Sequence, residues 1–126
     1  MNSALFFWAA SAFSAVCFAA HVFAGGKMFV APLMQNTTID PTIKSLSYVS
    51  WHCVSLLFAS FAVTFAFVAL KPQNVSLAAV ASLMSGATTI MIFAMALRGH
   101  NVMLKLPAVY FFGLIALLGS IGLIIK

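Results

Sequence analysis

The chain has 126 residues and a net charge of +5, with 64% hydrophobic residues and only 6% charged ones. A soluble domain usually carries about 25% charged residues, and a chain this short cannot hide so much apolar surface from water. The composition therefore excludes an ordinary soluble protein and indicates an integral membrane protein surrounded by lipid. The six cations stand singly at the ends of apolar runs, so we expect no nucleic-acid partner, which would need a clustered basic face.

The first predicted transmembrane span covers residues 4–24. No charged side chain precedes Lys27, which argues against a secretory signal peptide with its basic leading region. Gly25-Gly26 is typical of a helix end. We therefore expect the first helix to stop there and a loop to run from Lys27 to Ile39, apolar enough to lie on the membrane surface.

The second predicted helix begins at Asp40-Pro41, which offers an N-cap and a proline at the first helical position. Residues 41–46 are polar enough to stand at the interface, and the span itself covers 47–70. The tight turn Lys71-Pro72-Gln73-Asn74 then allows only an antiparallel neighbour.

The third predicted span covers residues 75–97 and ends at Gly99, a typical C-cap. The fourth covers 107–125, with Lys126 as its terminal anchor. The sequence thus predicts an all-α, integral membrane four-helix antiparallel (up-down) bundle, with residues 1–126 forming a single transmembrane domain.

Charge in the loops predicts the orientation of this bundle. An even number of spans places both termini on one side of the membrane. The loops at 25–46 and 98–106 carry four cations, against two on the other side. The positive-inside rule favours the better-charged side as cytoplasmic. The four are Lys27, Lys44, Arg98 and Lys105, and the two are Lys71 and Lys126.

Small and polar residues recur at helical spacing and predict the faces at which the helices meet. On the first helix the stripe is Ala10, Ser14, Cys17 and His21; on the second it is Tyr48, His52, Ser55, Ala59, Ala62 and Ala66; on the third it is Ala78, Ser82, Ser85 and Thr89. The opposite face of the second helix is expected to face lipid, at Val54, Leu57, Phe61, Phe65 and Val68. Further interface or structural positions are Gly25, Gly26, Trp51 and Gly86.

Histidines are the main candidates for chemistry. Asp40 is the only acid in the chain, which argues against paired-carboxylate catalysis and carboxylate-driven proton transport, and no catalytic residue is assigned. His21, His52 and His100 are expected on the same side of the membrane. Imidazoles there could bind a cofactor (His21 and His52, for haem or quinone) or a metal (all three). The alternative is interhelical hydrogen bonding, and the sequence requires no cofactor.

The pattern His21-x-x-x-Gly25-Gly26, followed by Trp51-His52 early in the second span, resembles a group of uncharacterised small four-span inner-membrane proteins of bacteria. The resemblance implies a bacterial inner-membrane location and draws attention to these five residues. It implies no activity.

Three functions remain as hypotheses. The first is an accessory or assembly subunit that associates with other membrane subunits or with itself and has no catalysis of its own. The small-residue stripes, and a stripe of methionines at Met84, Met91 and Met95, favour it because they offer more packing surface than one bundle needs. The second is a redox protein that binds haem, metal or quinone through His21 and His52. The third is a transporter of small solutes or ions.

Overall fold

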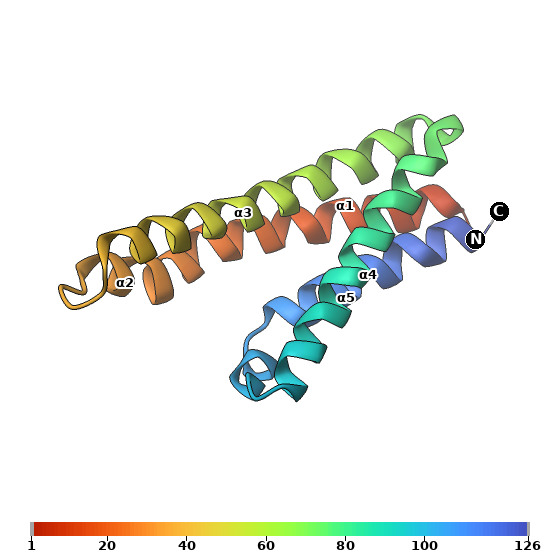
Figure 1. Cartoon of the computed structure of the whole chain (residues 1–126). Helices are drawn as coiled ribbons and strands as arrows, with labels where there is room; N and C mark the ends of the chain where they lie inside the picture. The colour runs from red at the N-terminus through yellow and green to blue at the C-terminus, as the bar shows by residue number, and fades with distance from the viewer. Residues whose placement is uncertain (1, 126) are drawn as a thin grey trace.

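The computed structural model describes residues 2–125, and every regular element in that range is a helix (Figure 1). In chain order these elements are α1 (Ser3–Ala19), the π-helix η1 (Ala20–Val30), α2 (Ala31–Gln35), α3 (Pro41–Leu70), the 3-10 turn η2 (Pro72–Asn74), α4 (Val75–Leu97), the 3-10 turn η3 (Asn101–Lys105) and α5 (Ala108–Ile124). The all-helical prediction is confirmed for this part of the chain. Lys126, predicted as an anchor, lies outside the described residues.

The first helix is longer than the sequence indicated. α1, η1 and α2 form one continuous helix from Ser3 to Gln35, so the predictions of a stop at Gly25-Gly26 and of a loop from Lys27 are wrong. The helix ends where the side chain of Asn36 accepts hydrogen bonds from the backbone N–H groups of Thr38 (2.8 Å) and Ile39 (3.1 Å). This local turn offers the backbone an alternative to further helix.

The other helix ends follow local sequence signals. Asp40 Oδ1 accepts from the backbone N–H of Thr42 (2.8 Å) and of Ile43 (3.4 Å), and so caps the start of α3. At the end of α4, Gly99 adopts a φ of +106°, and the N–H of His100 donates to the carbonyl of Met95 (3.1 Å). This is the Schellman arrangement that glycine permits because it has no Cβ.

Three helices are long and apolar enough to cross a membrane: Ser3–Gln35 with 33 residues, Pro41–Leu70 with 30 and Pro72–Leu97 with 26. At the α-helical rise of 1.5 Å per residue, the second extends about 45 Å and the first at most about 50 Å, because its π-helical turns rise less per residue, against a hydrocarbon thickness of about 30 Å. α5 is apolar but has only 17 residues, which corresponds to about 26 Å. One pair of helices is therefore much longer than the last helix.

The helices form two hairpins that pack together over only part of their length. The first helix runs along α3, α4 pairs with α5, and α5 also packs against α1. Figure 1 shows the hairpins together at the end that holds both chain termini, and diverging toward the other end. There the hairpin of the first helix and α3 continues alone. We call this segment, residues 20–35 and 41–52, the distal arm.

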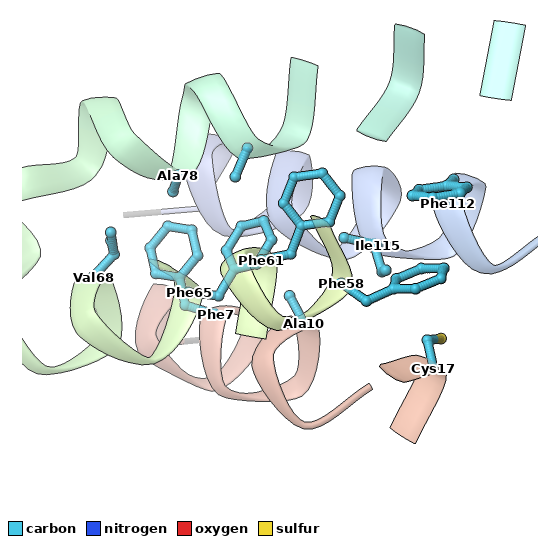
Figure 2. Packing of buried hydrophobic residues seen from close by; sticks show 11 residues of the cluster. Phe7, Ala10, Cys17, Phe58, Phe61, Phe65, Val68, Ala78, Phe112 and Ile115 are labelled. Atoms are coloured by element: carbon cyan, nitrogen blue, oxygen red, sulfur yellow. The ribbon is translucent and has the colours of Figure 1, made fainter. Parts of the chain in front are cut away.

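The core lies where the hairpins meet and is rich in phenylalanine. Phe58 of α3 stacks on Phe112 of α5 with ring centroids 4.6 Å apart, and Phe65 lies against Phe7 of α1 at 6.3 Å. Figure 2 shows Phe58 beside Phe112 at one end of this cluster, and Val68 with Ala78 at the other. The prediction that the face of α3 with Phe61, Phe65 and Val68 meets lipid is wrong, since all three are buried. Their large apolar area contributes more to packing than the alanines on the neighbouring face.

Small residues still let the helices approach closely. Ser11 Oγ of α1 donates to the carbonyl of Ala62 in α3 (2.8 Å), and Ser85 Oγ of α4 donates to the carbonyl of Phe112 in α5 (2.8 Å). A Cβ on Gly119 would collide with Ser82 Oγ and come within 2.8 Å of the Phe65 ring. The glycine is therefore required at this crossing.

Candidate functional site

The site begins with His21 and Trp51, which join the first helix to α3. Their rings stack with centroids 3.8 Å apart and an interplanar angle of 14°. His21 Nε2 lies 3.2 Å from the backbone carbonyl oxygen of Trp51. A carbonyl oxygen can only accept, so Nε2 carries the proton and donates it. Ser55 Oγ donates to the same carbonyl at 3.2 Å.

The predicted glycine pair has two different roles. A Cβ on Gly25 would lie 2.8 Å from the Trp51 ring, whereas a Cβ on Gly26 would meet no atom within 4 Å. Gly25 therefore lets the indole lie directly on the helix backbone. Burial of this large ring offsets the low helix propensity of glycine, which explains why the helix does not stop here.

Both glycines lie in the π-helix η1, which also includes His21. π-helical turns are rare and often occur at functional sites. This one ends just before Ala31-Pro32, and the proline ring would clash with the carbonyl four residues earlier in a regular α-helix. The wider turns accommodate Pro32 on one side and the Trp51 ring on the other.

An open groove of about 220 Å³ lies on the surface of the distal arm, beside this cluster. Most of its walls are apolar, while Tyr48 and His52 of α3 supply its polar edge. Their rings are perpendicular with centroids 4.5 Å apart. Gly26 forms part of the wall, and a Cβ there would meet no atom within 4 Å. The complete lining is Val22, Gly26, Val30, Ala31, Tyr48, Trp51 and His52.

The three histidines do not come together. His21 is half-buried against Trp51 and Phe58, while His52 is exposed, contrary to the prediction that both point into the bundle. His100 is exposed beyond the end of α4, in the other hairpin. Among residues 2–125, no three His, Cys, Asp or Glu side chains are grouped closely enough to hold a metal ion.

A haem does not fit the groove beside His21 and His52. His21 donates through Nε2 to Trp51, and that indole stacks on one face of its imidazole. A groove of about 220 Å³ is smaller than ordinary pockets for drug-sized ligands, which start near about 300 Å³, and a porphyrin is too large for it. Through its two contacts with Trp51, His21 links the first helix to α3.

The remaining predicted interface residues lie elsewhere in the fold. Ser55, Ser82 and Ser85 are buried, and Ser82 Oγ has no hydrogen-bond partner among the described residues. Ser82 and Gly86 line a second groove of about 390 Å³ between α4 and α5. Its wall otherwise consists of small and aliphatic side chains, which suits helix packing or lipid.

Sequence reasoning missed four contributors to the site. Val22, Val30 and Ala31 line the groove, and Phe58 contacts His21 edge-on at 5.8 Å between ring centroids. Two of them fall beyond the expected helix stop, so their helical face was not considered. The signal that could have found them is the apolar run that continues past Gly26 to Met34.

No protein-family model, curated protein or solved structure matches this chain.

Proposed function

We propose that this chain is a four-span integral membrane protein of the bacterial inner membrane, folded as an up-down helical bundle, that acts by associating with another membrane subunit or with a second copy of itself. In this role it is an accessory or assembly component with no catalysis of its own. The observation that carries the proposal is the distal arm.

The length of the arm supports the proposal, because part of its apolar surface would extend beyond the lipid tails. The two longest helices exceed the hydrocarbon by about 15–20 Å. The other hairpin diverges from them at this end (Figure 1), so it does not cover the excess. Large apolar side chains are nevertheless exposed along the arm, namely Phe23, Met28, Phe29, Met34, Ile43, Leu46 and Val49.

A contiguous apolar surface outside the hydrocarbon marks a protein interface. The arm carries only two charged side chains, Lys27 and Lys44, with Asp40 in the turn beside it, and Lys44 Nζ is partly satisfied by the carbonyl of Met34 at 3.3 Å. A partner would therefore meet a mostly apolar hairpin with few polar groups to desolvate.

Photo-crosslinking in intact membranes tests this proposal. A photoreactive side chain replaces Met28 on the arm, and a matched one replaces Val63 in the middle of α3. These positions are equally accessible, at 67% and 70% exposed. We expect a discrete protein adduct from position 28 and only lipid adducts from position 63. An adduct at twice the chain mass indicates self-association, and a different discrete mass indicates another subunit.

Equal yields of protein adduct at both positions would contradict the proposal, because contact would then not be concentrated on the arm. A second variant, Leu46→Lys, places a charge on the exposed arm without touching the core. It should lower the adduct yield from position 28 if the apolar surface drives association.

A further inference from the structure

We propose that the groove on the distal arm binds a quinone-class ligand, meaning a single planar ring that carries carbonyl oxygens and an apolar tail. This inference is independent of the proposed association, since a binding groove and a docking surface can exist together or separately. It also assigns the contact to Tyr48 and His52 and leaves His21 as a structural residue.

The polar edge of the groove favours a ligand that carries hydrogen-bond acceptors. Tyr48 and His52 are both exposed at this edge, and their rings are perpendicular to each other. Both can donate. An acyl chain has no hydrogen-bond acceptor to offer either group. A ring carbonyl oxygen would accept from them.

The rest of the groove wall is apolar and favours a ligand with a flat, apolar ring. The Trp51 indole forms one part of the wall, and aromatic side chains stack favourably on planar rings. Val22, Val30 and Ala31 add aliphatic surface. A polar solute would find few partners here, whereas a quinone ring presents two apolar faces and a polar rim.

The size and position of the groove agree with this ligand. About 220 Å³ accommodates one ring with its substituents, and the open side leaves room for a tail to extend outside the groove. Tyr48 and Trp51 are residue types enriched at the membrane interface. The head of a membrane-soluble quinone could reach this depth from the lipid.

The fixed geometry of the wall supports a preformed site. Trp51 is held by stacking on His21 at 3.8 Å and by the close approach of Gly25. Its backbone carbonyl also accepts from His21 and Ser55. The aromatic wall is therefore ordered before a ligand arrives, which lowers the cost of binding.

Tryptophan fluorescence tests the inference. Trp8→Phe leaves Trp51 as the sole tryptophan, and the protein in lipid nanodiscs is titrated with decylubiquinone, whose ring quenches a tryptophan that it contacts. We expect saturable quenching. Tyr48→Phe or His52→Leu should raise the half-saturating concentration by about ten-fold, the order of one lost hydrogen bond.

A matched pair separates binding from collisional quenching and from misfolding. Gly26→Leu fills the groove without a clash, because its Cβ enters open space, and should abolish saturation while helicity by circular dichroism is unchanged. The reverse protein, Trp51→Phe with Trp8 kept, should show only linear quenching. Linear quenching of Trp51 in the unmodified groove would overturn the proposal, as would saturable quenching that survives Gly26→Leu. Quenching by bromine-labelled acyl chains that decylubiquinone does not relieve would overturn it in favour of a lipid.

Discussion

At the scale of single residues, the glycine pair offers a sharp contrast within one turn of helix. Gly25→Ala places a Cβ 2.8 Å from the Trp51 ring, while Gly26→Ala places one in open space. We expect Gly25→Ala to destabilise the protein by about 1–3 kcal/mol through overpacking. Gly26→Ala should stabilise it by about 0.5–1 kcal/mol because alanine restricts the unfolded chain. Denaturant unfolding in detergent micelles measures both.

The two substitutions control for each other, since each adds one methyl group to the same π-helix. Equal effects would mean that Trp51 does not lie on Gly25. Emission from Trp51 in the Trp8→Phe background gives a second readout, which should shift in the Gly25 variant alone.

Asp40 controls the start of α3 in a pH-dependent way. Hydrogen bonds from the backbone and side chain of Thr42, with a further one from the N–H of Ile43, hold the pKa of this exposed carboxyl below its usual value. A lowered folded-state pKa means that the stabilisation is present above the ordinary aspartate pKa and is lost as pH falls through the folded value. The amide resonances of Thr42 and Ile43 should therefore titrate together below about pH 4.

Asp40→Asn keeps an acceptor for the cap but has no titrating group. The two amides should then stay in their capped positions across the acid range. An acid transition of the same size in the Asp40→Asn protein would show that another group is responsible.

At the scale of helices, a buried serine should contribute to the free energy of unfolding only where its hydroxyl has a hydrogen-bond partner. Ser85 Oγ donates to the carbonyl of Phe112, whereas buried Ser82 Oγ has no partner among the described residues. We expect Ser85→Ala to cost about 0.6–1.7 kcal/mol, the range of such bonds in membrane proteins. Ser82→Ala, on the same face of α4, should be neutral or stabilising. Unfolding in mixed micelles compares them directly.

The same scale shows what the sequence could and could not predict. α3 and α4 have their bounds where Asp40-Pro41, Lys71-Pro72 and Gly99 indicate, because caps and breakers act locally. The first helix continues through Gly25 because the Trp51 ring of another helix packs there. The sequence around Gly25 gives no indication of this contact. The face of α3 was misjudged for a related reason. Phenylalanine suits lipid and a membrane-protein core equally in composition, and only contacts such as Phe58 with Phe112 decide between them.

The candidate site was predictable in part. His21, Gly25 and Trp51 were singled out from the sequence, and the structure brings them together. We expected His21, His52 and His100 to lie close together because all three are predicted on the same side of the membrane. A shared side does not by itself bring side chains into contact. His52 follows Trp51 directly and lies about 100° further round α3, so it does not share the position from which the indole stacks on His21. The divergence of the hairpins then separates His100, an effect of tertiary packing that spacing does not reveal.

At the scale of the whole molecule, the connectivity predicts which loops share a side of the membrane. The turn at Asn36–Asp40 and the turn at Arg98–His100 follow helices that start from the end holding both chain termini, whereas the turn at Pro72–Asn74 lies at that end (Figure 1). The first two should therefore be accessible from one side and the third from the other. The positive-inside rule, with Lys27, Lys44, Arg98 and Lys105 near the first two, favours the cytoplasm for them.

Single cysteines at Thr37, His100 and Gln73, all exposed positions, test this topology in a background with Cys17 and Cys53 replaced by alanine. An impermeant maleimide added to intact cells should label Gln73→Cys, while Thr37→Cys and His100→Cys should react only after the membrane is opened. Labelling of all three from outside would contradict the four-span arrangement. The reverse pattern would keep the arrangement but invert it, and would show that the excess of four cations over two is too small to set the orientation. In either orientation, the distal arm and the quinone groove should remain on the side of Thr37, because the first helix and α3 carry both.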